Sequence, residues 1–394
     1  MKKCKKCFLP ETHETISFNN VGECNVCVNH EKKRDEIDWK KRKLKLDSLI
    51  SQNKGKGDYD CIIPFSGGKD STWAAYYLVK EYGLKPLLVR FDHGFMRPNI
   101  EENIKKVVRK LGVEILTFTP NWKIVQKLML KSFLDKGDFC WHCHTGIYSY
   151  PMWISIEKKI PLIFWGEGPG EYNNYNSFDE EMNVDENLFN KFINLGINAE
   201  DMYLRLNGEI SLRDLKPYQY PPLEELKKIN CKSVALGNYI LWDTKKQSEI
   251  IMRELDWKGD EVENVPPEYN YEKIECYMQG VRDYIKYIKR GYSRTSHLVA
   301  LDRRNKRITE KDGLEKIKLY DGKRPASLDI FLKFIGLSEE EFMKVAIHHG
   351  ISPYEHDIKK TENAKRTEDY DKWSKDGEIE QKYAKKLFNE WSKK

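Results

Sequence analysis

The chain has 394 residues, enough for more than one structural unit around an ample apolar core. Hydrophobic residues make up 40% of it and aromatic residues 12%, a globular rather than a disordered composition. The formal net charge is +6, from 68 basic and 62 acidic residues, which is compatible with an anionic small substrate or RNA and establishes neither. No apolar run approaches ~20 residues and the start MKKCKKC lacks the apolar core of a signal peptide, so we expect a cytoplasmic protein with reduced cysteines and no membrane span.

Two cysteine pairs stand near the start of the chain. Cys4-x-x-Cys7 and Cys24-x-x-Cys27 are separated by sixteen residues, which is the spacing of a two-knuckle zinc site. Zinc prefers four tetrahedral ligands, and a segment this short needs the metal in order to fold. We therefore predict a zinc-knuckle module over residues 1–30, closed and without catalysis. The alternative is four unligated cysteines in a mobile arm.

A strongly charged stretch comes next. The pattern of residues 31–50 is helical, and SQNKGKGD follows as a polar break, so we interpret residues 31–57 as a charged helix and linker. Its basic run is compatible with RNA contact, but we favour a solvated helix face.

Apolar strands then alternate with helices over residues 58–250. Strands are expected at DCIIPF, KPLLVRFD, VEILTFT and IPLIFWGEG, and KSVALGNYILWD opens a fifth strand or a closing helix. This alternation predicts an α/β domain, a parallel sheet with helices on both faces. Ligands of such sheets bind at the carboxyl ends of the strands, where FSGGKDS, RFDHG and WGEG fall. Residues 251–394 predict a mainly helical C-terminal region.

The stretch FSGGKDS indicates phosphate binding. Gly67 and Gly68 allow the backbone to approach an anion, so that the N–H groups of the turn and of the following helix can surround phosphate oxygens. Lys69 adds a positive charge, and Asp70 is understandable if it holds Mg²⁺ beside the phosphates. The loop is not a Walker A motif, because Ile63 and Asp70 stand where that motif needs Gly and Ser or Thr. The alternative is an ordinary strand–helix turn.

SGGKDS after a strand resembles the PP-loop ATP pyrophosphatase superfamily, whose fold is that of the adenine nucleotide alpha hydrolases. The resemblance implies attack of a substrate oxygen on the α-phosphate of ATP, followed by displacement of AMP by a nitrogen or sulfur nucleophile. It implies ATP contacts at Ser66, Gly67, Gly68, Lys69, Asp70, Ser71, Asp92, Gly166 and Glu167. It also implies catalysis by Lys69 and Asp70, and Mg²⁺ at Asp70, Glu167 and Glu171. The segment GEGPGE departs from the commoner Gly-Glu-Gly-x-Asp-Glu form at Gly170.

The segment FCWHCHTG carries a further set of reactive side chains, namely Cys140, His142, Cys143 and His144, which we take as catalytic candidates. A Cys-x-x-Cys with two histidines is compatible with a redox pair, a metal site, a substrate pocket or a packed turn before a helix. Taken alone, the cysteines favour sulfur transfer, and a tRNA sulfurtransferase stays open as the alternative function. A zinc-ribbon scaffold that binds RNA is the non-enzymatic alternative.

Longer stretches resemble the N-acetyl sugar amidotransferase family over residues 1 to about 345. They are the knuckle, the PP-loop, FCWHCHTG, LGNYILWD, SRTSHLVALDRRNKRIT and GKRPASLDIFLKFIG. The resemblance implies conversion of an acetamido to an acetamidino group on a bacterial sugar, with release of AMP and pyrophosphate. The sugar would be a nonulosonic acid such as pseudaminic acid, for flagellin glycosylation, or a nucleotide-linked N-acetyl sugar for lipopolysaccharide. Ammonia would come from a separate glutaminase and synthase-like pair, and no nucleic acid is expected.

The implied reaction needs a base and an anion-binding group. His142 and His144 are the candidates for the base. Arginine binds carboxylates and phosphates through paired hydrogen bonds, so basic residues of the family stretches are candidates for substrate binding. They are His297, Arg303, Arg304, Lys323 and Arg324. For each one alone, a solvated surface charge is the alternative.

Overall fold

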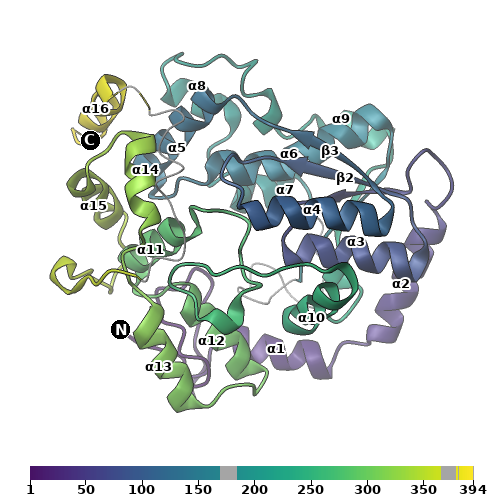
Figure 1. Cartoon of the computed structure of the whole chain (residues 1–394), viewed down its shortest axis with the longest axis horizontal. Coiled ribbons are helices and arrows are strands. Elements are labelled where there is room, and N and C mark those ends of the chain that lie inside the picture. The colour runs from purple at the N-terminus through teal and green to yellow at the C-terminus, as the bar shows by residue number, and fades with distance from the viewer. Residues whose placement is uncertain (169–183, 365–378, 380, 394) are drawn as a thin grey trace.

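A five-stranded parallel sheet forms the centre of the molecule (Figure 1). The computed structural model describes residues 1–168, 184–364, 379 and 381–393. The strands lie in the order β3-β2-β1-β4-β5, and every pairing is parallel. Their bounds are Cys61–Pro64 (β1), Pro86–Phe91 (β2), Glu114–Phe118 (β3), Leu162–Trp165 (β4) and Lys232–Ala235 (β5). The expected parallel α/β fold is confirmed, and KSVALGNYILWD does open a fifth strand.

Alternation along the strands gives the sheet two apolar faces. Ile63, Leu88 and Phe164 point into one core, shared with α3 (Lys69–Tyr82), α4 (Pro98–Leu111) and α10 (Thr244–Leu255). Ile62, Val89 and Ile163 point into the opposite core, shared with α6 (Trp141–Lys158). Helices therefore cover both faces, as such a sheet requires.

The fourth helix illustrates how the sequence sets these elements. Pro98 begins α4 and Gly112, in the left-handed region at φ 66°, ends it. Between them Ile100, Ile104 and Val107 recur at helical spacing and are buried against the sheet.

The N-terminal module packs on the C-terminal region. Its four cysteines form one small apolar cluster with Tyr292 and Ala300, the latter on α12 (Arg294–Arg304). Behind it the charged segment forms two helices instead of one, α1 (Asn25–Asp35) and α2 (Trp39–Ser51). The side chain of Asp38 caps α2 by accepting a hydrogen bond of 3.0 Å from the Lys41 amide.

The C-terminal region is helical, as expected, and shares a core with α5 (Trp122–Lys136) and α6. Its helices are α11 (Gln279–Arg290), α12 (Arg294–Arg304), α13 (Glu310–Tyr320), α14 (Ser327–Ile335), α15 (Glu339–His348) and α16 (Gln381–Trp391). Shorter helices are α7 (Glu186–Leu188), α8 (Ala199–Arg205), α9 (Leu223–Lys228), a π-helix at Phe189–Ile193, and 3₁₀ turns at Lys216–Tyr218, Leu236–Asn238, Pro267–Tyr269 and Ile358–Lys360. Across the described residues, no helix has both the length and the apolar character needed to cross a bilayer.

Candidate active site

The glycine-rich loop joins the central strand β1 to the start of α3. Gly67 has φ 79°, and a Cβ on it would lie 2.6 Å from Cγ1 of Ile104. A Cβ on Gly68 would lie 1.8 Å from Oε1 of Glu275. Gly67 therefore requires glycine for its backbone conformation, and the Glu275 carboxylate rests directly on Gly68.

Side chains from other elements hold the loop in place. The indole Nε1 of Trp257 donates a hydrogen bond of 2.9 Å to the carbonyl of Gly67. The amide of Ser66 donates to the hydroxyl of Ser71, and the amide of Gly68 donates to the hydroxyl of Ser66, both at 3.3 Å. The two predicted serines thus shape the turn.

Lys69 carries a buried positive charge beside the loop. Its side chain is 3% exposed and forms ion pairs with Asp70 at 2.7 Å and with Glu272 at 3.2 Å. Burial disfavours this charge, but the carboxylates of Asp70, Glu272 and Glu275 outweigh burial and raise the pKa of Lys69. The side chain is therefore a fixed ammonium group that can meet phosphate oxygens.

Asp70 and Glu167 come together although they follow different strands. A Cβ on Gly166 would lie 2.4 Å from the carbonyl oxygen of Asp70, so the end of β4 touches the first turn of α3. Oδ1 of Asp70 is buried without a hydrogen-bond partner among the described residues. The Tyr148 hydroxyl donates to Glu167. Burial raises the pKa of Glu167, the Tyr148 bond and the charge of Lys273 oppose this shift, and Asp70 adds to it.

These two carboxylates are the donor set expected for Mg²⁺, which prefers oxygen ligands and is usually held by one or two carboxylates together with substrate phosphates. The third predicted ligand, Glu171, lies outside the described residues. Asp92 follows β2 and accepts a hydrogen bond of 2.9 Å from the Gly94 amide and one of 3.3 Å from the Thr119 hydroxyl. It therefore braces the turn after its strand, and its contact with the nucleotide stays a prediction.

The segment 271–278 was missed by the sequence reasoning. It precedes α11 and brings Glu272, Lys273 and Glu275 over the loop. The sequence feature that could have pointed to this segment is a local one, namely two carboxylates and a lysine among buried apolar positions such as Ile274. Nothing in that pattern says which distant element the charges meet.

The segment FCWHCHTG forms the beginning of α6. Cys140 precedes the helix, and its amide donates a hydrogen bond of 2.8 Å to Oδ1 of Asp138. Burial raises the pKa of the thiols of Cys140 and Cys143, so both are protonated at neutral pH. Burial also lowers the pKa of His142 and of His144 to about 3, so both rings are neutral.

This segment and the loop are linked through segment 271–278, and we call the side chains of these three segments the chamber. The charge of Glu275, whose carboxylate covers Gly68, acts on the thiol of Cys143. Lys273 acts on both Glu167 and His144. The structure thus brings the two predicted motifs together, with the missed segment 271–278 between them.

The N-terminal cysteines form a compact site. The ligating atoms of Cys4, Cys7, Cys24 and Cys27 all lie within 4.8 Å of one another, and all four residues are buried. The Sγ atoms of Cys4 and Cys27 are 4.0 Å apart, and those of Cys7 and Cys24 are 3.6 Å apart. A tetrahedral site with Zn–S bonds of about 2.3 Å requires sulfur atoms about 3.8 Å apart. The predicted ligand set is therefore assembled around one metal position.

The predicted arginine pair of α12 makes contacts with the N-terminal module. Arg303 Nε donates to the carbonyl of Lys6 at 3.2 Å, and its guanidinium lies over the ring of Phe8. The charge of Arg304 acts on Cys7. Arg303 therefore helps to attach the module to α12, and Arg304 acts on the module through its charge.

The other predicted substrate residues are also engaged within the protein. Arg324 pairs with Asp329 and Glu339, each at 2.7 Å, and Lys323 pairs with Glu362. His297 Nε2 lies 3.0 Å from the ammonium group of Lys286, and its ring packs against His13 and Tyr292. Their role in substrate binding stays a prediction.

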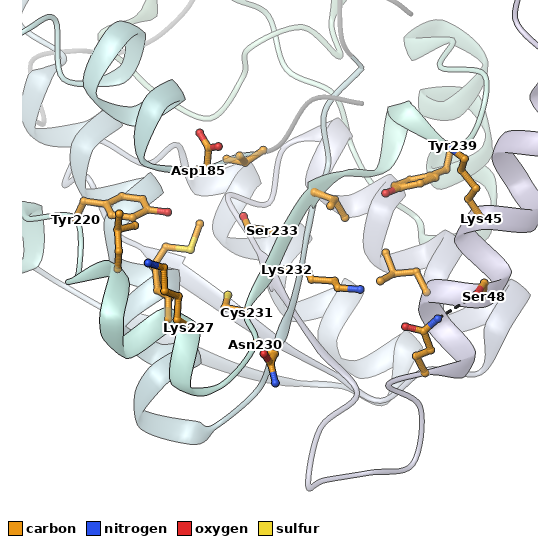
Figure 2. A pocket seen from close by; sticks show the side chains of 17 residues that line it. Lys45, Ser48, Asp185, Tyr220, Lys227, Asn230, Cys231, Lys232, Ser233 and Tyr239 are labelled. Atoms are coloured by element: carbon orange, nitrogen blue, oxygen red, sulfur yellow. Dashed lines mark hydrogen bonds between the residues drawn. The ribbon is translucent and has the colours of Figure 1, made fainter. Parts of the chain in front are cut away.

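A large open cleft lies away from these motifs, at the outer edge of β5. Figure 2 shows its lining, which includes Lys45 of α2, Lys232 of β5 and Tyr220. Its volume is about 820 Å³. Because none of its lining residues belongs to the loop, to FCWHCHTG or to segment 271–278, we place the candidate site in the chamber and not in this cleft.

Three comparisons bear on the family. Residues 268–388 match the family model described as "LPS biosynthesis protein WbpG-like, C-terminal domain". An uncharacterised protein of Methanocaldococcus jannaschii, MJ1599, is 30% identical over 115 residues, which are 29% of this chain and 41% of that protein. The chain therefore matches less than half of this relative's length. The U34-tRNA thiolase NcsA from Methanococcus maripaludis, solved with its [4Fe-4S] cluster, matches at 15% identity and a TM-score of 0.31, over 81% of this chain and 87% of that one. So low a TM-score carries no argument about this chain.

The C-terminal match includes the segment that covers the loop. Glu272, Lys273 and Glu275 all fall within residues 268–388, so the WbpG-like part of the chain completes the chamber. The parallel sheet with its glycine-rich loop and the WbpG-like match thus meet at this segment. The C-terminal third of the chain thus carries a WbpG-like domain, and this match fits the N-acetyl sugar amidotransferase family that the motifs of the chain resemble.

Proposed function

We propose that this protein is an ATP-dependent N-acetyl sugar amidotransferase. It would convert an acetamido group of a bacterial surface sugar, a nonulosonic acid or a nucleotide-linked sugar, into an acetamidino group, with release of AMP and pyrophosphate. The observation that carries the proposal is the chamber, in which a phosphate loop with a buried ammonium group faces side chains from a WbpG-like domain.

The loop and Lys69 would bind the phosphates of ATP. The amides of Gly68 and of the first turn of α3 supply N–H donors, and the Lys69 ammonium supplies charge. Asp70 and Glu167 would hold Mg²⁺, which would neutralise charge on the leaving pyrophosphate when bound. An incoming triphosphate would compete with Glu275 for the space over Gly68, so this carboxylate has to move aside.

The amide oxygen of the sugar would attack the α-phosphorus, and the bond to pyrophosphate would break. Ammonia would then add to the activated carbon, and the C–O bond to AMP would break to leave the amidine. Lys273 forms no ion pair or hydrogen bond with a described residue. Its charge acts on both Glu167 and His144 and can stabilise the negative charge on the departing groups.

The ammonia adduct has to lose a proton before AMP leaves. His144 is neutral in the free protein and faces the chamber, so it is available to accept that proton. A pKa of about 3 makes it a weak base, and negative charge on the adduct would raise this pKa during the reaction. His142 is neutral for the same reason and is the second candidate.

Two further parts of the proposal concern the metal and the ammonia source. We propose Zn²⁺ as the ion of the four-cysteine site, because four thiolates at tetrahedral spacing are its usual structural ligands. We propose that ammonia comes from a separate glutaminase and synthase-like pair, as the resemblance to the N-acetyl sugar amidotransferase family implies.

The test is a reaction of the purified protein with Mg²⁺–ATP, ammonium chloride and acetamido sugars, with N-acetylneuraminic acid and UDP-N-acetylglucosamine as first probes. We expect AMP and pyrophosphate release that needs both sugar and ammonium, and a product lighter by the difference between O and NH in mass spectrometry. Omission of ammonium is the matched control. Sugar-independent AMP release, with no change in the mass of any sugar in a wider panel, would contradict the proposal.

A tRNA sulfurtransferase is the second candidate, favoured by the cysteines of the chamber. Cys276, in segment 271–278, acts electrostatically on both Cys140 and Cys143. The raised pKa of these thiols disfavours a thiolate nucleophile in the free protein. Thiolated nucleosides in tRNA incubated with the protein, ATP and sulfide, and their loss in a Cys140→Ala variant, would favour this function over the first.

A further inference from the structure

The sequence offers four arginines and lysines for substrate binding, and the structure shows that all four already have partners in the protein. Arg303 and Arg304 contact the N-terminal module, and Arg324 is paired with two carboxylates. A side chain that binds an anionic substrate needs a charge that is still available in the free protein. One such cation stands at the chamber itself.

Arg282 is that residue. It lies in the first turns of α11, directly after the segment that covers the loop, and its side chain is only partly exposed. Its guanidinium group forms no hydrogen bond or ion pair with a described residue. The other described arginines without such a contact, Arg109 and Arg213, are exposed at the surface, where water solvates them.

The carboxylates near Arg282 are engaged elsewhere. Asp283 pairs with Arg294 at 3.4 Å and accepts a hydrogen bond of 2.9 Å from Nε2 of Gln279. Asp138 accepts the amide hydrogen bond of Cys140 at 2.8 Å. Both are close enough to act on the guanidinium electrostatically, yet neither forms an ion pair with it. A partly buried cation without a partner is costly, so its position here calls for a ligand.

The surroundings of Arg282 connect it to the chamber. Its charge acts on Cys143 and His144 of the α6 motif and on Cys276 of the covering segment. The same Cys143 is under the influence of Glu275, whose carboxylate lies over Gly68. Arg282 is thus linked to the loop through side chains of α6 and of segment 271–278, the segment whose Glu275 contacts Gly68 and which directly precedes α11.

We propose that Arg282 binds the anionic group of the sugar substrate, a carboxylate or a phosphate. A planar guanidinium offers two parallel N–H donors to such a group. ATP would then be held from the loop side and the sugar from the α11 side, with the acetamido group between them. This inference rests on the proposed function for the identity of the ligand as a sugar, and on the structure alone for the presence of an anion site.

The first experiment compares the kinetics of Arg282→Gln, Arg282→Lys and Arg109→Gln, the last being the matched control at an exposed arginine. We expect Arg282→Gln to raise the KM for the acidic sugar about 10- to 100-fold, as for the loss of a charged hydrogen-bonded pair, with the KM for ATP nearly unchanged. Arg282→Lys should fall between the wild type and Arg282→Gln, because it keeps the charge and loses the paired geometry. An unchanged KM for the sugar in Arg282→Gln would overturn the inference and leave the proposed function standing.

The second experiment does not depend on turnover. In a Lys69→Met background, which weakens the loop as a competing phosphate site, inorganic phosphate should raise the unfolding temperature. The rise should disappear in Lys69→Met/Arg282→Gln. An equal rise in both proteins, or no rise in either, would overturn the anion site even if no sugar substrate is found. Arg282→Gln should not itself lower the unfolding temperature without phosphate, and a large decrease would instead indicate a structural role.

Discussion

Two Cys-x-x-Cys regions of this protein have the same spacing and different outcomes. At the N-terminus two such pairs converge, and four sulfur atoms surround one position within metal-binding distance. At the start of α6 a single pair, Cys140 and Cys143, forms no such group of three or more metal-binding side chains within the described part of the chain. A second cysteine pair at a suitable distance in the sequence therefore specifies a closed metal site, whereas the role of a single cysteine pair depends on the side chains that the fold places opposite it.

The surroundings of the two regions differ in the same way. The N-terminal cysteines are covered by apolar residues of the module and by Tyr292 and Ala300, so the site is isolated from the chamber. The α6 cysteines face charged groups, among them Arg282 and Glu275. We therefore expect changes in the first region to act on stability, and changes in the second region or in the loop that it faces to act on the reaction.

The largest effect is expected on the chamber side, for Lys69→Met. Loss of the ammonium group that pairs with Asp70 and Glu272 should lower the rate of AMP formation about 10²- to 10³-fold. Because the two acids lose this ion pair, the protein should also be less stable, and Lys69→Met/Glu272→Gln is the control for that loss. The rate of AMP formation is measured by quenched flow in Lys69→Met and in a variant of equal stability that keeps Lys69. Near-normal rates would remove Lys69 from the mechanism.

The next largest effect is expected for Cys24→Ser in the N-terminal module. One ligand of four is lost, so the protein should contain less than one metal ion per chain and lose several kcal/mol of stability, a part of the about 10–16 kcal/mol found for structural zinc in small modules. Metal analysis and chemical denaturation of the full chain are the measurements. If the variant kept its metal and its stability and lost only activity, the division between the two regions would be wrong.

A smaller effect is expected for His142, whose burial in the chamber should make the free energy of unfolding depend on pH. The pKa of His142 is about 3 in the folded protein because of burial, against about 6.5 when unfolded. Below pH 6.5 the unfolded state therefore takes up a proton that the folded state does not. The contribution of neutral His142 to the free energy of unfolding is fully present above pH 6.5 and decreases as the pH falls toward 3, by about 2 kcal/mol at pH 5. The free energy of unfolding should depend less on pH between 4.5 and 6.5 in His142→Gln than in the wild type. An equal slope in His142→Gln and in a His348→Gln control would contradict this assignment.

The smallest effect on stability is expected for Cys143→Ala. This thiol belongs to no assembled metal group of the described residues, so its removal should change stability by about 1 kcal/mol and leave the metal content at the wild-type value. The rate of sugar-dependent AMP formation and the free energy of unfolding are measured on the same preparation, so that a loss of activity can be separated from a loss of stability. A loss of bound metal in Cys143→Ala would show that the α6 pair is a second metal site and would end the contrast with the N-terminal module.

The basic residues show which property could not be predicted from the sequence, namely whether a cation is engaged within the protein or available to a substrate. Arg303, Arg304 and Arg324 stand in long family-like stretches, yet their contacts are with the N-terminal module and with carboxylates of the C-terminal helices. Arg282 stands in no motif that the sequence singled out, and among the described residues it has no hydrogen-bond or ion-pair partner for its guanidinium group. A charge is available or engaged according to its neighbours in space, and local sequence does not list those neighbours.

The sequence by itself determined the features that local chemistry specifies. The alternation of strands such as Ile62–Ile63 with helices predicted the parallel sheet, Gly67 and Gly68 predicted a tight turn into a helix, and two cysteine pairs predicted the four-cysteine cluster, because each depends on residues close together in the chain. Only the tertiary structure brought segment 271–278 over the loop and Arg282 to the far side of the chamber. These contacts join residues about 200 positions apart, and they arise because the C-terminal helices share a core with the sheet domain and not because of any pattern within segment 271–278.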